Sequence, residues 1–227
     1  MTNPALAILA ILVITYQRAD VLRDTLRALA DHLAYNGDVT IIVADDGSTD
    51  HTASVVAAHR DLFHSHTHLV ITDRGGLGAN TNNGLRAAFA HADFVLQLQD
   101  DMELLTTLDV TPHVQWLQSH PQDGFIRLWG VCGHKYTATL DERYWRVRWE
   151  SDELYIPSDR PHLKTRAFHD AAGYYPEGLK SAETEEAFCH QCKSAANVPF
   201  VLVPHGLDTE KNFEHRCWGE RWRDKGL

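Results

Sequence analysis

The sequence predicts an α/β fold built on a mostly parallel sheet that is flanked by helices. Over the first hundred residues, short unbroken apolar runs alternate with segments in which apolar residues recur every three or four positions. The unbroken runs are typical of strands covered on both faces, and the periodic segments are typical of helices packed on them. Such alternation produces βαβ units with parallel strands and right-handed crossovers. We therefore expect a Rossmann-like half at the start of the chain.

Four strands and three helices are expected in this half, in strict alternation. The apolar run 8–14 predicts the first strand, and leucines at steps of four, three and four over 19–33 mark one face of the helix that follows. The remaining elements are, in order, a strand over 39–44, a helix over 54–60, a strand over 68–72, a helix striped by Leu77, Thr81, Leu85 and Phe89, and a strand over 94–98.

The chain beyond residue 104 differs in composition, and we expect it to form a second, mixed half. All six tryptophans lie after residue 110. Strand-like stretches at 125–131, 144–149 and 200–203 are mixed with one helix over about 184–195. We therefore divide the chain into residues 1–104 and residues 105–227, and we expect the two halves to share one core.

Composition and charge exclude several classes of function. A formal net charge of -10 argues against a nucleic-acid partner bound through its phosphates. The apolar run 5–14 is too short to span a bilayer and lacks the basic flank of a signal peptide. Four cysteines without dense spacing favour a reducing compartment, so we expect a cytoplasmic protein.

Polar side chains follow all four expected strands at the point where each strand ends. In open parallel sheets, ligands bind outside the carboxyl ends of the strands, so these tails should meet in one site. The tails are residues 15–18 (TYQR), 45–50 (DDGSTD), 74–80 (RGGLGAN) and 99–103 (QDDME). Together they supply carboxylates, a glycine-rich turn and an arginine.

These motifs, in this order, resemble family 2 glycosyltransferases, which have the GT-A fold. Residues 15–18 and 45–50 are similar to the opening of that family, residues 76–84 to its glycine- and asparagine-rich segment, and residues 99–101 to its metal-binding motif. The resemblance covers roughly the first 105 residues. It implies an enzyme that transfers a sugar from a nucleotide-diphosphate sugar to an acceptor hydroxyl with inversion. Residues 1–104 would then bind the donor, and residues 105–227 would bind the acceptor and supply the base.

A divalent cation fits the chemistry that the resemblance implies. Negative charge grows on the leaving diphosphate in the transition state, and a hard cation held by carboxylate oxygens can neutralise it. We expect Asp101 to be the ligand of Mn²⁺ or Mg²⁺, with Asp100 turned toward the ribose or a metal-bound water. Gln99 stands where the commoner motif has its first acid, which leaves the metal affinity open.

The resemblance also implies a set of nucleotide contacts. Asp45 is similar to the family residue that accepts hydrogen bonds from the base, which favours UDP and leaves guanine open. Thr15 would flank the base, and Arg74 could meet a phosphate. A turn or helix-cap role is the alternative for Asp45, Asp46 and Ser48. The remaining candidates for nucleotide binding are Gln17, Arg18, Asp46, Gly76, Asn80 and Asn82.

An inverting transfer needs a general base near the acceptor hydroxyl. In the family this acid opens a helix after the acceptor loop, and residues 173–178 followed by the glutamates of 183–186 look like that region. Glu185 is the first choice for the base, with Glu186 and Glu183 as rivals. Each could instead be a first-turn acid that favours the helix dipole.

Two features near the C-terminus leave alternatives open. His205 follows an expected strand and is similar to the histidine that often completes the family's metal site, while His215 competes for that role. Cys189 and Cys192 could instead form a zinc site with His215 and Cys217. Because the first pair lies inside a predicted helix, core packing accounts for it better.

The expected partners are a nucleotide-sugar donor and a glycan, lipid-linked or small-molecule acceptor. The tail over 215–225 interleaves tryptophan with arginine, so peripheral contact with a membrane stays open. Two other functions compete. A sugar-1-phosphate nucleotidyltransferase usually opens with a glycine-rich loop, which residues 15–18 do not provide. A non-catalytic relic that binds sugar nucleotides or glycans is suggested by Gln99, and by Thr81 where the family often has arginine.

Overall fold

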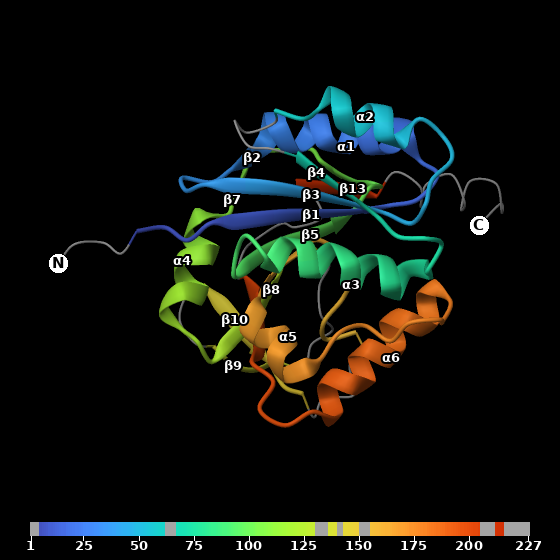
Figure 1. Cartoon of the computed structure of the whole chain (residues 1–227). Coiled ribbons are helices and arrows are strands. Elements are labelled where there is room, and N and C mark those ends of the chain that lie inside the picture. The colour runs from blue at the N-terminus through green and yellow to red at the C-terminus, as the bar shows by residue number, and fades with distance from the viewer. Residues whose placement is uncertain are drawn as a thin grey trace, which may run out of the picture.

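The computed structural model describes residues 5–61, 67–129, 136–139, 143–149, 155–204 and 212–215. Its centre is a nine-stranded mixed sheet with the strand order β4-β3-β1-β5-β11-β8-β12-β10-β9. Helices α1 and α2 lie on one side of the first strands, and α3 lies on the other side (Figure 1). The expected α/β class, with a large and mostly parallel central sheet, is thus present.

The first half follows the predicted alternation closely. Strand β1 lies between β3 and β5 and runs parallel to both, and β4 adds a further parallel strand beside β3. The strands are β1 (Leu9–Thr15), β3 (Val39–Asp45), β4 (Thr67–Ile71) and β5 (Phe94–Gln99). The helices between them are α1 (Ala19–His32), α2 (Thr52–Ala58) and α3 (Gly76–Phe89). All four strands therefore end at the same edge of the sheet.

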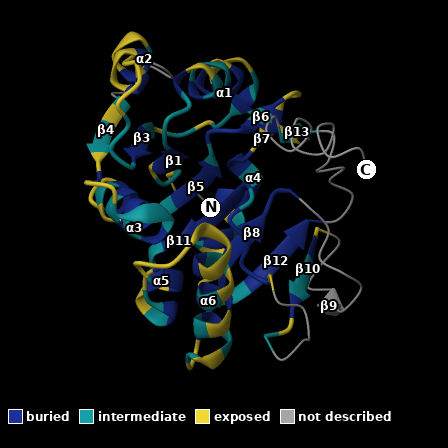
Figure 2. Ribbon diagram, turned by 90° about the vertical axis from the view of Figure 1, so that its right-hand side faces the viewer, coloured by how far each residue is buried: buried dark blue, intermediate teal, exposed yellow. Residues whose placement is uncertain are grey.

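Burial on two sides explains why the strands read as unbroken apolar runs. All seven residues of β1 are buried (Figure 2). Leu9, Ile11 and Val13 belong to the core that holds the apolar face of α1, and the residues between them belong to the core beneath α3. Because neither face of the strand meets water, no polar residue is needed within it.

The second half continues the same sheet. Strand β11 (His162–Thr165) pairs antiparallel with β5 and with β8 (Asp123–Arg127), and β12 (Phe200–Pro204) runs parallel to β8. Strands β10 (Tyr144–Val147) and β9 (Tyr136–Thr139) complete the sheet in antiparallel order. The helices are α4 (Thr111–Ser119), α5 (Arg166–Ala172) and α6 (Ser181–Ser194). The proposed halves are therefore joined through the β5–β11 pairing.

Two small sheets lie apart from the main one. Strand β6 (Met102–Leu104) pairs antiparallel with β13 (Phe213–His215), and Figure 2 shows the two side by side. Strand β2 (Leu33–Ala34) pairs with β7 (Leu108–Asp109). The sequence predicted neither pair, nor did it predict α4, α5 or β11. Among the described residues, no helix is both long and apolar enough to cross a membrane.

Candidate active site

The carboxyl ends of the first three parallel strands are tied together by one buried side chain, Asn80 of α3. Its Nδ2 donates to the main-chain oxygens of Thr15 (3.3 Å) and Ala44 (3.0 Å), at the ends of β1 and β3. Its Oδ1 accepts a hydrogen bond from Thr72 Oγ1 at 3.1 Å, just beyond β4. Asn80 was predicted to contact the nucleotide. In the structure, its side chain holds together the strand ends from which the site residues extend.

The acid pair that follows β5 is almost completely enclosed. Asp100 and Asp101 are only 1% and 3% exposed. Thr15 Oγ1 donates to Asp100 Oδ2 at 2.7 Å, and Arg18 Nη1 lies 3.1 Å from Asp100 Oδ1 and 2.6 Å from Asp101 Oδ2. Burial raises the pKa of Asp100 to about 6, although the Arg18 charge and the Thr15 bond oppose that rise. The two acids thus form one electrostatic unit with Arg18.

A short strand from the far end of the chain brings a histidine to this unit. Because β13 pairs with β6, directly after the acid pair, His215 Nε2 lies 3.9 Å from Asp101 Oδ2. His205, the histidine preferred from the sequence, lies outside the described residues. His215, its predicted competitor, is therefore the histidine that the structure places beside the acids.

The residues at this point fit a divalent cation in part. Asp101 Oδ1 is buried and accepts no hydrogen bond from any described residue, so the carboxylate has unused capacity as a ligand. Carboxylate oxygen and imidazole both suit manganese. No group of three metal-binding side chains is assembled among the described residues. Oxygens of water and of a diphosphate would have to complete the coordination shell.

The part of this edge at the end of β3 is organised around Asp45, which is 2% exposed. Asp45 Oδ1 accepts hydrogen bonds from the main-chain N–H and the hydroxyl of Ser48, and Ser48 Oγ in turn accepts the main-chain N–H of Gln17 at 2.7 Å. Gln17 Nε2 donates to Thr49 Oγ1 at 2.8 Å. The tails of β1 and β3 are thus held against each other, with Asp45 beneath them.

Asp46 and Arg74 lie on the outer part of this edge. Both carboxylate oxygens of Asp46 accept the N–H of Gly76, the first residue of α3, at 3.1 and 3.2 Å. This is the turn or cap contact that was the alternative for Asp46, and the Ser48 N–H bond to Asp45 is a turn contact of the kind that was the alternative for Asp45. The Arg74 guanidinium lies over the Tyr16 ring, 4.9 Å from its centre.

Asn82 connects the glycine-rich helix to the loop before α6. Its Nδ2 donates to Tyr175 O (2.9 Å) and to Glu177 Oε1 (2.7 Å), and its Oδ1 accepts the N–H of Tyr175 (2.9 Å). The sequence suggested a nucleotide contact for Asn82. The structure shows that its amide joins α3 to the segment that leads to the predicted base.

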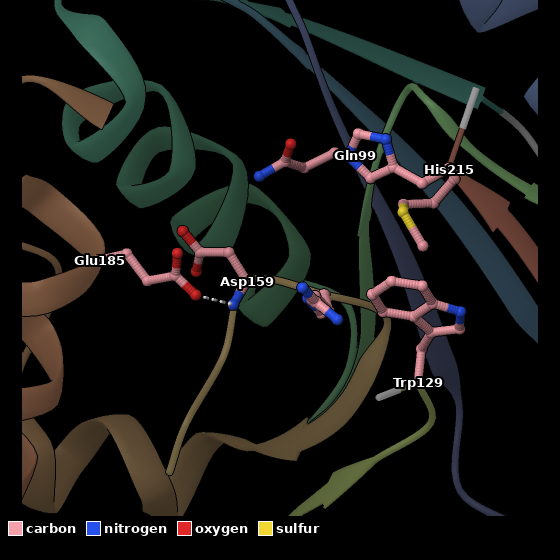
Figure 3. Close-up of a pocket in the computed structure, with 7 residues that line it drawn as sticks. Gln99, Trp129, Asp159, Glu185 and His215 are labelled. Atoms are coloured by element: carbon pink, nitrogen blue, oxygen red, sulfur yellow. Dashed lines mark hydrogen bonds between the residues drawn. The ribbon is translucent and has the colours of Figure 1, made fainter. Parts of the chain in front are cut away.

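Of the three candidate bases, Glu185 is the one that lines the cavity described below. Its Oε1 accepts hydrogen bonds from the main-chain N–H of Asp159 (3.0 Å) and from Ser158 Oγ (3.2 Å); Figure 3 shows the first of these as a dashed line. Glu183 is exposed and its Oε2 accepts the N–H of Lys180 at 3.2 Å, which caps α6. Glu186 is exposed and lies 3.8 Å from His190 on the same helix. The first-turn role considered for these glutamates therefore fits Glu183.

The cavity has a volume of about 140 Å³, and its lining includes Gln99 and Met102, the residues on either side of the acid pair in the sequence. Glu185 and Asp159 line one side of it, and Gln99, Trp129 and His215 line the other (Figure 3). His215 also lies beside Asp101. The cavity thus connects the predicted base with the end of β5.

Two buried charged groups near Glu185 were not predicted. Burial and the Glu185 charge raise the pKa of Asp159, and burial lowers the pKa of Lys164. The Lys164 ammonium lies 5.1 Å from the centre of the Tyr175 ring. Asp159 comes from a proline-flanked loop and Lys164 from the four-residue strand β11. Neither setting has a pattern that distinguishes a functional acid or lysine from a surface one.

The cysteines on α6 are part of the core. Cys189 and Cys192 are buried and form no disulfide, and Cys189 Sγ donates to Pro157 O at 3.1 Å. Cys217, the fourth member of the alternative zinc site, lies outside the described residues. His215 belongs to the acid pair instead.

Comparison with known families gives this geometry a context. The model for Glycosyl transferase family 2 matches residues 10–195, which include the acid pair, Asn82 and Glu185. The chain belongs to glycosyl transferase family 2. The expected family is thereby confirmed, and with it the expected class of enzyme at the level of the family.

A curated relative in this family is the poly(ribitol-phosphate) beta-N-acetylglucosaminyltransferase TarS of Staphylococcus aureus. It is 26% identical over 196 residues, which are 85% of this chain and 34% of TarS. The chain thus spans about a third of the length of that relative.

Solved structures of glycosyltransferases share the fold. The structure of S. aureus TarS 1–349 with UDP-GlcNAc matches with a TM-score of 0.64 and 23% identity, over 92% of this chain and 60% of that one. The mannosyltransferase PcManGT from Pyrobaculum calidifontis, in complex with GDP-Man and Mn2+, matches with a TM-score of 0.66 and 16% identity, over 90% and 56% of the two chains. These likenesses confirm the predicted GT-A fold class.

Proposed function

We propose that this family 2 domain transfers a sugar from a UDP-sugar to an acceptor hydroxyl, with inversion and with the help of a divalent cation. The observation that supports the proposal is the cavity that Glu185 shares with His215, the histidine that lies 3.9 Å from Asp101. The buried acid pair lies at the end of β5, and Glu185 lies across the cavity on α6. TarS, whose name is that of an N-acetylglucosaminyltransferase, makes UDP-GlcNAc the first donor to test.

Glu185 is the proposed general base. Both of its hydrogen bonds to described residues go to Oε1, which fixes the carboxylate and directs Oε2 to the acceptor. The acceptor hydroxyl passes its proton to Glu185 while its oxygen forms a bond to the anomeric carbon. The bond from that carbon to the diphosphate breaks, and UDP leaves with the electron pair.

The acid pair serves the leaving group. A divalent cation bound there supplies positive charge against the charge that develops on the diphosphate. Asp101 and His215 would hold it, with Asp100 adjacent. Asp45 is proposed to accept hydrogen bonds from the base, since its carboxylate lies at the end of β3 where a nucleoside would stack.

The experiment that tests the base compares Glu185→Gln with Glu186→Gln. Both remove one charge from neighbouring positions of the same helix, but only Glu185 lines the cavity. We expect UDP release from UDP-GlcNAc to fall about 10²- to 10⁴-fold in Glu185→Gln, because a general base contributes about that much, and to change little in Glu186→Gln. UDP affinity, measured by calorimetry, should stay the same in both. Full turnover in Glu185→Gln would show that another residue is the base.

A thermal-shift panel tests the donor nucleotide. UDP, GDP, dTDP and CDP are compared with and without Mn²⁺. A ligand at about a hundred times its Kd adds about 2.7 kcal/mol, which raises the Tm of a domain this size by about 5 to 10 °C. A shift with UDP alone, and only with metal, supports the proposal. Binding without turnover would favour the non-catalytic relic. Family membership already favours sugar transfer over the nucleotidyltransferase alternative.

The remaining expectations stay predictions. They concern the glycan, lipid-linked or small-molecule nature of the acceptor, the cytoplasmic location and a membrane contact of the tail beyond residue 215. The tail lies outside the described residues.

A further inference from the structure

Arg18 occupies the position between the two acids that a cation would take. A single atom, Nη1, lies 3.1 Å from Asp100 Oδ1 and 2.6 Å from Asp101 Oδ2. Arg18 immediately precedes α1, and 40% of its side chain is exposed, whereas the acid side chains are 2% and 5% exposed. The guanidinium therefore covers a buried pair of carboxylates from the solvent side.

The pair needs a positive charge whether or not a metal is bound. Two adjacent carboxylates removed from water repel each other, and each loses hydration that an exposed carboxylate keeps. A guanidinium supplies both charge and hydrogen-bond donors. In the structure, Arg18 meets this requirement with the protein's own side chain.

Arg18 competes with a metal for the same oxygen. Of the two oxygens of Asp101, Oδ1 is buried and accepts no hydrogen bond from any described residue, and Oδ2 is the oxygen nearest to His215. That oxygen is the one that Nη1 contacts at 2.6 Å, and it also faces His215 Nε2 at 3.9 Å. A divalent cation binds carboxylate oxygen at about 2.0 to 2.6 Å. An ion held by Oδ2 and His215 would therefore lie within repulsive distance of the guanidinium.

We infer that Arg18 is an exchangeable internal cation. It holds Asp100 and Asp101 in the metal-free protein and leaves them when a divalent cation binds. The apparent metal affinity of the site then depends on how much more favourably the acid pair binds the divalent cation than it binds the Arg18 guanidinium. This inference rests on the metal site in the proposed function, and it assigns to Arg18 a role other than the nucleotide contact predicted from the sequence.

The first test measures Mn²⁺ binding to the full chain without nucleotide, from the EPR signal of free Mn²⁺. We expect Arg18→Gln to bind Mn²⁺ about tenfold more tightly than the wild type, equal to about 1.4 kcal/mol. Arg23→Gln is the matched control. It removes the same charge from α1, where Arg23 pairs with the exposed Asp20 and with Asp24, and it should leave the affinity within about twofold.

Equal or weaker Mn²⁺ binding in Arg18→Gln would overturn the inference, as would an equal gain in Arg23→Gln, because a general change of charge would then explain the result. Absence of Mn²⁺ binding in both the wild type and Arg18→Gln would also overturn it. Asp101→Asn should abolish the binding in either background, which shows that the titrated ion is at this site.

A second test follows the exchange in the unmodified protein. Phenylglyoxal reacts with accessible guanidinium groups, and peptide mass spectrometry reads the rate at each arginine. Saturating Mn²⁺ should raise the rate at Arg18 several-fold and leave that at Arg23 unchanged. An unchanged or lower rate at Arg18 contradicts the exchange. Loss of UDP release in Glu185→Gln is measured separately, so the exchange and the proposed base can fail independently.

Discussion

Replacement of Asn82 by alanine tests the connection between α3 and the segment that leads to Glu185. Asn82 is 1% exposed and makes three hydrogen bonds to the loop before α6. Asn82→Ala leaves the N–H and C=O of Tyr175 without the amide that pairs with them. We expect a less stable protein in which the approach to α6 is less firmly held.

The contacts set the size of the effect. A buried hydrogen bond contributes about 1 kcal/mol net, and a buried group left without its partner costs about 1 to 3 kcal/mol. Two bonds reach the main chain of Tyr175 and one reaches the half-exposed Glu177, so the free energy of unfolding should fall by about 3 kcal/mol. For a domain of this size, this lowers the Tm by about 6 to 12 °C.

Urea unfolding, followed by tryptophan fluorescence, measures the loss. Asn83→Ala is the control, because Asn83 is the next residue of α3 and is only partly buried. Its Nδ2 makes one bond, to Thr72 Oγ1 at 3.1 Å, and its Oδ1 accepts one from Arg86. It should cost about 1 kcal/mol or less. If Asn82→Ala cost no more than Asn83→Ala, the bonds to the loop would not carry the stability assigned to them.

Three further substitutions probe the rest of the fold, each by urea unfolding. Burial lowers the pKa of His113 from 6.5 to about 4, so the free energy of unfolding falls as the pH falls from 6.5 to 4. Each pH unit between the two pKa values is worth about 1.4 kcal/mol. Over that range the free energy of unfolding should therefore fall by about 3 kcal/mol less in His113→Gln than in the wild type. Gly78→Ala would place a Cβ 2.1 Å from the carbonyl oxygen of Pro176 and should cost about 1 to 3 kcal/mol. Asp123→Ala removes the buried partner of Arg146, 2.8 Å away, and should cost about 3 kcal/mol.

Each of these has a control at an exposed or open position. His91→Gln, at an exposed histidine, should change the free energy of unfolding by less than about 0.5 kcal/mol. A Cβ at Gly178 meets nothing within 4 Å, so Gly178→Ala should cost only the backbone penalty of its positive φ, about 1 to 2 kcal/mol. Asp93→Ala breaks an exposed pair with Arg166 and should cost less than about 1 kcal/mol. Equal losses in a variant and its control would contradict the corresponding structural reason.

The first half of the fold was predictable because its strands are buried on two sides. Strand β1 and the central part of β3 therefore contain apolar residues without interruption, and each predicted strand in this half lies within a residue of its observed bounds. The second half was less predictable. Strand β11 is buried, yet it contains the polar residues His162 and Lys164. Its sequence therefore lacks the apolar run that would predict a buried strand.

The site could be predicted where sequence motifs lie next to buried strands. Asp100 and Asp101 follow β5 directly, and Glu185 lies near the start of a recognisable helix. The roles of Asn80 and Asn82 could not be predicted, because they depend on contacts with residues up to 95 positions away. Asp159 was missed for a similar reason: its position beside Glu185 depends on how a loop packs on α6.

The pairing of β13 with β6 has a consequence for how often the site is complete. This strand has only three residues and lies outside the nine-stranded sheet, and its buried Phe213 anchors it to the core. Such a unit can detach by local unfolding at a cost well below that of unfolding the domain. If detachment costs about 1.4 kcal/mol, His215 is absent from the acid pair in about one molecule in eleven. The fraction of molecules with a complete site is then governed by the docking of one short strand, and any partner or mutation that alters that docking changes the fraction without touching the catalytic groups.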